Sequence, residues 1–165
     1  MLKKIVSRLN STTITVNGKP YLTRYYLFGH DRAWGNIYIH HFHSSDQGIE
    51  LHSHPWRWGL SIVLSGGYVE ERSHNPTIWE LDEHGTEIAI GHPVVKHQIH
   101  IERRNIKPGT INVIRSTDFH RVDLNDEIKG AWTLFFAGPR TFSWGFLNRN
   151  TAEYKDWKSN PEAIP

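Results

Sequence analysis

The stretch GIELHSHPWRWGLSIVLSGGYVEE, residues 48–71, places His52 and His54 one residue apart, just before a run rich in tryptophan and aliphatic residues. Alternate residues of an extended chain point to the same side, so Glu50, His52 and His54 share one face if this segment is a strand. Two imidazoles and a carboxylate on one face begin a divalent metal site. An isolated pair of this kind is more often two surface histidines on an edge strand, so the rest of the chain must decide.

The rest of the chain consists mainly of short strand signals. Apolar and polar residues alternate in STTITVNG, NIYIHHFH and VVKHQIHIERRNI, which begin at residues 11, 36 and 94. Asn17-Gly18 is a hairpin turn pair, Gly66-Gly67 ends a buried run, and residues 77–90 read as another hairpin. Helical signals are sparse, with one short helix expected over residues 152–158. The pattern predicts an all-β protein, an antiparallel sandwich or barrel.

Length and composition limit the class of protein. The 165 residues suit one domain spanning residues 1–165, with 38% hydrophobic residues and no cysteine. The formal net charge of +2 does not indicate a nucleic-acid partner. No apolar stretch is long enough for a membrane span or a signal peptide, so a cytoplasmic location is expected.

The first part of the quoted stretch resembles a motif of the cupin superfamily. That motif has a glycine, an HxH pair, a strand and a closing glycine, and the matching residues here are Gly48, His52, His54 and Gly66. The resemblance implies a single antiparallel jelly-roll barrel, over approximately residues 12–147, with the histidines in its interior. It also implies a homodimer, because many cupins pair through one sheet.

A second cupin motif has a glycine that opens a strand and a lone histidine after a tight turn. Residues 108–125, PGTINVIRSTDFHRVDLN, match it, with Gly109 at the start and His120 eleven positions later. The wider pattern HxHPW…GGY…HRV…WTLFFxGPR is similar to small single-domain cupins of bacteria and phages. The resemblance covers roughly residues 37–138.

One departure from the cupin pattern concerns the metal ligands. Cupins usually carry a glutamate four or five residues after HxH, where this chain has Trp58 and Gly59. The resemblance therefore implies a site of three histidines, His52, His54 and His120, for a divalent ion such as Fe, Zn, Ni or Mn. Three-histidine iron sites occur in the thiol dioxygenase branch of cupins. Additional ligands, or groups that orient His120, are expected among Glu50, Asp118, His43 and His41.

Aromatic and basic residues near the motifs are candidates for the wall of a small-molecule pocket. Tryptophan packs in the core by default, but it also forms the wall of a site for a sugar or a nucleobase. An arginine inside a barrel binds a carboxylate or a phosphate. The candidates are Trp56, Trp58, Trp132 and Arg57.

Three functions remain open at this point, and no residue is assigned as catalytic. The first is a metal-dependent enzyme, of oxygenase or isomerase type, that acts on a small polar molecule. The second is a metal-free sugar-nucleotide isomerase or epimerase whose pocket histidines act as acid and base. The third is a cupin that binds a small ligand, or has a structural role, without turnover.

Overall fold

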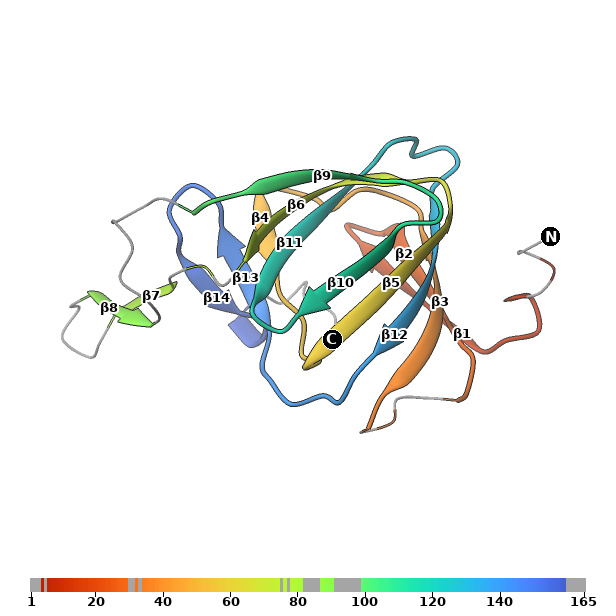
Figure 1. The fold of residues 1–165 in the computed structure, drawn as a ribbon, viewed down its shortest axis with the longest axis horizontal. Coiled ribbons are helices and arrows are strands. Elements are labelled where there is room, and N and C mark those ends of the chain that lie inside the picture. The colour runs from red at the N-terminus through yellow and green to blue at the C-terminus, as the bar shows by residue number, and fades with distance from the viewer. Residues whose placement is uncertain are drawn as a thin grey trace.

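Two six-stranded antiparallel sheets form the protein, as the pattern of short alternating strands predicts (Figure 1). The computed structural model describes residues 4, 6–29, 32, 34–74, 76, 78–81, 87–90 and 99–159. Sheet A has the strand order β1-β2-β3-β12-β5-β10, and sheet B has the order β14-β13-β4-β11-β6-β9. Neighbouring strands are often far apart in sequence, as in a jelly roll.

The strand boundaries follow the alternating runs. Sheet A contains β1 (Ser11–Val16), β2 (Lys19–Tyr26), β3 (Asn36–Phe42), β5 (Trp58–Ser65), β10 (Ile111–Arg115) and β12 (Ala131–Ala137). Sheet B contains β4 (Glu50–His52), β6 (Tyr68–His74), β9 (Glu102–Ile106), β11 (Asp118–Leu124), β13 (Gly145–Asn148) and β14 (Tyr154–Asp156). A separate hairpin of β7 (Ile78–Leu81) and β8 (Glu87–Ile90) lies beyond β14 at the left of Figure 1.

Turn residues fix how the strands connect. Asn17 and Gly18 both have positive φ, 51° and 72°, which is the geometry of a type I′ hairpin between β1 and β2. Gly66 joins β5 to β6 with φ of 77°, and a Cβ there would lie 2.2 Å from the carbonyl oxygen of Gly130. Only glycine fits at residue 66, which explains why strand β5 ends just before it.

The tight turn before His120 contains neither proline nor glycine. Asp118 Oδ2 accepts a hydrogen bond of 2.8 Å from the backbone N–H of Arg115, so a side chain closes the two-residue connection between β10 and β11. An aspartate that bonds to nearby backbone replaces the usual turn residues. His120 therefore lies at the third residue of β11.

Apolar residues inside the barrel form two clusters with a polar middle. One contains Tyr38 and Phe135, and the other contains Val63, Tyr68 and Val122. His40 lies between Tyr38 and Phe42 on the inward face of β3, and its ring stacks on Phe135 at a centroid distance of 5.1 Å. The core thus leaves room for polar side chains halfway along the barrel.

The C-terminal segment differs from the sequence expectation. A short helix was predicted over residues 152–158, but Tyr154–Asp156 is strand β14 and only Trp157–Ser159 is helical, as a single 3-10 turn. Pairing with β13 satisfies the backbone of β14, and this tertiary contact outweighs weak local helix propensity. The predicted hairpin over residues 77–90 forms, although its turn, residues 82–86, lies outside the described residues. None of the described helices is long and apolar enough to cross a membrane.

Candidate metal centre and barrel cavity

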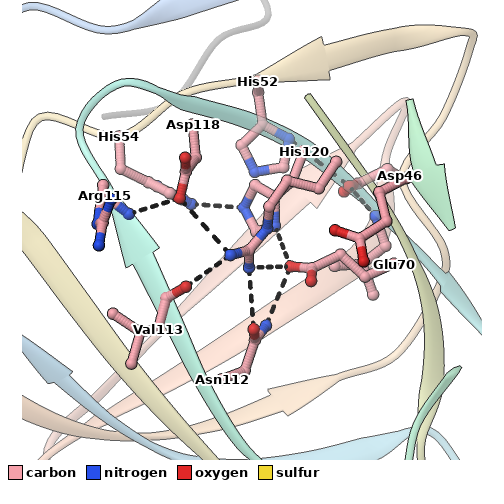
Figure 2. A network of polar contacts seen from close by, with 12 residues as sticks. Asp46, His52, His54, Glu70, Asn112, Val113, Arg115, Asp118 and His120 are labelled. Carbon is pink, nitrogen blue, oxygen red and sulfur yellow. Dashed lines mark hydrogen bonds and ion pairs between the residues drawn. The ribbon is translucent and has the colours of Figure 1, made fainter. Parts of the chain in front are cut away.

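Three histidines meet on sheet B at the cavity side of the barrel. His52 ends β4 and is paired in register with His120 of β11, while His54 follows two residues after His52. The potential ligand atoms of the three residues all lie within 4.8 Å of one another (Figure 2). The sheet register therefore brings together two histidines that are 68 positions apart in sequence. Their role as metal ligands remains a prediction.

Glu70 determines which nitrogen of His120 faces the cluster. Oε1 of Glu70 lies 2.8 Å from Nδ1 of His120, and Nε2 of His120 lies 2.8 Å from Nε2 of His54. Burial raises the pKa of Glu70, but its contacts with His120 and Arg72 outweigh burial and lower the pKa to about 2. The ionised carboxylate accepts a hydrogen bond from Nδ1 of His120, so Nε2 is the nitrogen that faces His54 and that a metal ion would bind.

Burial favours the neutral imidazole at His52 and His54. Burial lowers the pKa of His52 to about 4, although the nearby Asp46 carboxylate raises it. Burial and the neighbouring His120 lower the pKa of His54 well below its usual value. Neutral imidazole is the form that binds metal. The three side chains thus fit a divalent ion in their chemistry as well as in their positions.

The carboxylate of Asp46 lies beside the ring of His52. Its Oδ2 lies 3.6 Å from Nδ1 of His52 and accepts a hydrogen bond of 2.7 Å from the backbone N–H of Val122. Its Oδ1 accepts a short hydrogen bond from the hydroxyl of Tyr21. These bonds hold a carboxylate at ion-pair distance from the His52 ring.

A buried charge network lies behind His120. The guanidinium of Arg72, only 2% exposed, donates to Glu70 Oε1 at 2.7 Å, to Asn112 Oδ1 at 3.0 Å and to the Val113 carbonyl at 2.5 Å. It also lies 3.5 Å from Asp118 Oδ2. Figure 2 shows these contacts around Glu70 and Asn112.

Sequence reasoning missed Glu70 and Arg72, although a signal was present. Alternation along YVEERSH puts these two charged residues on one face of β6 and Glu71 on the other. The expected orienting group, Asp118, instead bonds His74 at 2.9 Å and the Arg115 backbone. The group that bonds Nδ1 of His120 is Glu70, so the expectation for Asp118 was wrong in that respect. A carboxylate and an arginine on one inward face could have predicted a buried ion pair.

Glu50 lines the same cavity but stands apart from the three histidines. It shares β4 with His52, as the alternating pattern predicts, and pairs in register with Asn148. Its carboxylate is not part of the group whose ligand atoms lie within 4.8 Å of one another.

His41 and His43, which were expected among additional ligands or orienting groups, lie outside the cavity lining. Both point away from the cavity, because the alternation of β3 turns His40 inward instead. The ring of His41 stacks on Trp132 at 4.0 Å, and Nε2 of His43 lies 2.8 Å from the Thr23 hydroxyl. Adjacent residues of a strand face opposite sides, and only the fold decides which side is interior.

Among the four residues predicted to line the pocket, only Trp56 does so. Its ring stacks on His54 at 5.0 Å and 22°. Trp58 is 45% exposed and Arg57 is exposed, because β5 begins at Trp58 with Gly59 as its first inward residue. Trp132 packs on the outer face of sheet A, against Tyr25 and His41, and outside the cavity lining. The irregular chain after Pro55 breaks the alternation that would have placed Trp56 and Trp58 together.

The cavity has a volume of about 740 Å³ and extends between the two sheets. This is the size of a site for a small organic molecule. Charged and polar residues of the lining include Arg24, Arg32, His40, Asp46, Glu50, His52, His54, Ser61, His120, Thr133 and Arg140.

Comparisons with known proteins support the fold. No protein-family model matches the chain, and no curated protein matches it in sequence. The crystal structure of Fe(II)-HppE with the alternative substrate (S)-1-HPP is similar, with a TM-score of 0.53 and 9% identity over 80% of this chain and 57% of that one. A structure of FeII HppE in complex with substrate has a TM-score of 0.53 and 10% identity over the same shares.

A third solved structure has a lower score. It is an uncharacterized conserved protein with a double-stranded β-helix domain from Klebsiella pneumoniae, with a TM-score of 0.45 and 16% identity over 80% of this chain and 87% of that one. This chain spans a little over half, 57%, of the length of HppE. At such low identity the likeness to HppE shows the fold alone. With the observed sheet topology, it confirms the predicted antiparallel jelly-roll fold.

Proposed function

We propose that His52, His54 and His120 bind one divalent transition-metal ion and that the protein is a metal-dependent enzyme acting on a small polar molecule. The observation that carries this proposal is the meeting of three imidazoles, with potential ligand atoms within 4.8 Å of one another, on the wall of a cavity of about 740 Å³. The structural likeness to HppE, whose structure holds Fe(II), agrees with it.

The kind of metal follows from the ligand atoms. Three imidazole nitrogens suit Fe(II), Zn, Ni or Mn, and the chain has no cysteine to offer a thiolate. A bound ion of this kind would supply Lewis acidity toward a substrate oxygen or a water molecule. Neutral ligands leave the charge of the ion uncompensated, which favours binding of an anionic or chelating substrate.

The side chains around the cluster have positioning roles. Glu70 keeps Nε2 of His120 directed at the cluster, and Asp46 places a carboxylate beside Nδ1 of His52. Trp56 covers His54 with its indole ring and keeps water from that side. These contacts hold the three imidazoles in place before any ion arrives, so little ordering is needed on binding.

One observation favours the metal-free alternative, in which the histidines serve as acid and base. The Nε2 atoms of His54 and His120 lie 2.8 Å apart, so that the two imidazoles can share one proton. An isomerase or epimerase would use such a pair to move a proton to and from substrate carbon. A metal ion would occupy the same two nitrogens, so the two functions exclude one another.

Metal analysis of protein purified without an affinity tag separates these functions. We expect one equivalent of Fe, Zn, Ni or Mn per chain, or stoichiometric uptake on titration of chelator-treated protein. Protein that holds no metal and takes up none of the four ions would disprove the proposal and favour the acid–base alternative. Solvent proton exchange into candidate substrates would then be measured for wild-type protein and for His54→Gln.

A further inference from the structure

A second polar group lies in the cavity, on the sheet opposite the histidine cluster. Arg24 of β2, His40 of β3 and Thr133 of β12 are direct cross-strand neighbours, with Arg24 paired to His40 and His40 paired to Thr133. All three line the cavity from sheet A, whereas His52 and His120 line it from sheet B. The three residues form a continuous polar row, here called the Arg24 row, in a wall that is otherwise mainly aromatic and aliphatic.

The Arg24 row has hydrogen-bonding atoms that the protein leaves unused. His40 is 5% exposed and Thr133 is 1% exposed, yet His40 Nε2, the Thr133 hydroxyl and Arg24 Nε have no hydrogen-bond partner. Within the part of the chain that the structure describes, the Arg24 guanidinium forms no ion pair. Buried polar groups almost always have partners in folded proteins, so three adjacent exceptions around a cavity indicate a ligand or water that completes them.

The contrast with Arg72 shows that this arrangement is not a general feature of the barrel. Arg72 Nε has no partner among the described residues either, but both terminal nitrogens of Arg72 are engaged, with Glu70, Asn112 and a backbone carbonyl. Arg24 instead lies over aromatic rings, with its guanidinium carbon 4.9 Å from the Tyr38 centroid and 5.9 Å from that of Trp56. Stacking holds the guanidinium in place and leaves its N–H groups free to donate.

The donors of the Arg24 row favour an oxyanion. A guanidinium and a hydroxyl can both donate, and a neutral imidazole can donate from Nε2, so an acceptor-rich ligand satisfies all three. Two more arginines line the cavity, Arg32 and Arg140, against two carboxylates, Asp46 and Glu50. Asp46 is already engaged by Tyr21 and the Val122 backbone, so the lining offers three arginines against one further carboxylate, Glu50.

The ring of Trp56 lies near both the histidine cluster and the Arg24 row. Its ring lies 5.0 Å from the ring of His54 and 5.9 Å from the guanidinium carbon of Arg24. A molecule of a few carbon atoms can therefore lie along one indole and reach both ends.

We propose that the Arg24 row binds the oxyanion group, carboxylate or phosphoryl, of the small molecule whose other end lies at the three histidines. The second half of this statement rests on the proposed function, whereas the oxyanion site does not. The substrate class is thus a short organic anion.

Calorimetric titration of metal-free protein tests the oxyanion site without competition from the ion. The probes are propionate for a carboxylate and inorganic phosphate for a phosphoryl group, with propionamide as the uncharged control. We expect at least one anion to bind and propionamide not to bind. Arg24→Gln and Thr133→Val should each weaken that binding about tenfold or more, as loss of a charge-assisted or buried hydrogen bond does. Arg57→Gln, at an exposed arginine outside the cavity, should bind like wild type.

Thr133→Val also separates a ligand-binding role from a structural one. Because the Thr133 hydroxyl has no partner within the protein, valine should leave the melting temperature unchanged or higher while anion binding falls. Failure of both anions to bind, or equal affinities in wild type, Arg24→Gln and Thr133→Val, would overturn the inference. Anion binding that depends on Arg24 in a protein that takes up no metal would instead reject the proposed function and leave the oxyanion site standing.

Discussion

Replacement of Glu70 by glutamine tests whether one buried carboxylate both stabilises the barrel and prepares the histidine cluster. Glu70 is fully buried and accepts hydrogen bonds from His120, Arg72 and Asn112 through Oε1. Glutamine keeps the shape of the side chain but removes its charge. Arg72 would then be left with Asp118, at 3.5 Å, as its one remaining carboxylate among the described residues.

The expected loss of stability follows from the pKa of Glu70. Its contacts with His120 and Arg72 outweigh burial and lower the pKa from 4.5 to about 2. At about 1.4 kcal/mol per pKa unit, this difference is worth about 3 kcal/mol, which agrees with the roughly 3–5 kcal/mol for breaking a buried ion pair. Each kcal/mol lowers the melting temperature by about 2–4 °C at this chain length. We therefore expect metal-free Glu70→Gln to melt about 6–12 °C below wild type.

Metal affinity should fall in the same variant. A neutral amide fixes the tautomer of His120 less firmly than a carboxylate, and loss of such a supporting group typically weakens metal binding about 10- to 100-fold. Differential scanning calorimetry of metal-free protein measures the stability, and competition with a chromophoric chelator measures the affinity. The two readings together distinguish a variant that is merely destabilised from one that also binds metal poorly.

Glu71→Gln is the matched control. Glu71 is the next residue of β6, but it faces the other way and pairs with Arg149 at 2.7 Å and Arg121 at 3.8 Å. We expect a smaller loss of stability, since Arg149 is partly exposed, and unchanged metal affinity. The reasoning would be refuted if Glu70→Gln matched wild type in both measurements, or if Glu71→Gln lost metal affinity to the same extent.

Three further predictions concern the histidine cluster. His52→Ala and His120→Ala should each lose most of the bound metal but stay folded, which elemental analysis and circular dichroism would check. His100→Ala, at an exposed histidine, should retain the metal. Loss of metal in His100→Ala alone would contradict the proposed site. Glu50→Gln should leave the metal content unchanged, because its carboxylate lies outside the group of three; an equal loss in Glu50→Gln and His52→Ala would make Glu50 a ligand. Burial lowers the pKa of His52 to about 4, below 6.5 in the unfolded chain, so metal-free protein should be most stable above about pH 6.5 and lose stability as the pH falls toward 4. Urea unfolding at pH 7 and pH 5 would measure this, and an undiminished pH dependence in His52→Ala would assign it to another group.

The amino-acid sequence determined the fold class and the three histidines that meet. Strand alternation, turn pairs such as Asn17-Gly18 and the glycine at residue 66 are local signals, because they follow from backbone geometry within a few residues. The resemblance of residues 48–71 and 108–125 to two cupin motifs predicted that His120 joins the HxH pair, and the pairing of β11 with β4 places His120 opposite His52.

Tertiary structure decided which face of each strand is interior and which charges pair. Alternation gives two faces without saying which is buried, so His41 and His43 were expected where His40 lies. The irregular chain after Pro55 separated Trp56 from Trp58, which no periodic pattern could reveal. The contact of Glu70 with His120 and the pairing of the Arg24 row depend on register between strands that are distant in sequence. Such contacts exist only once both sheets have closed around the same cavity.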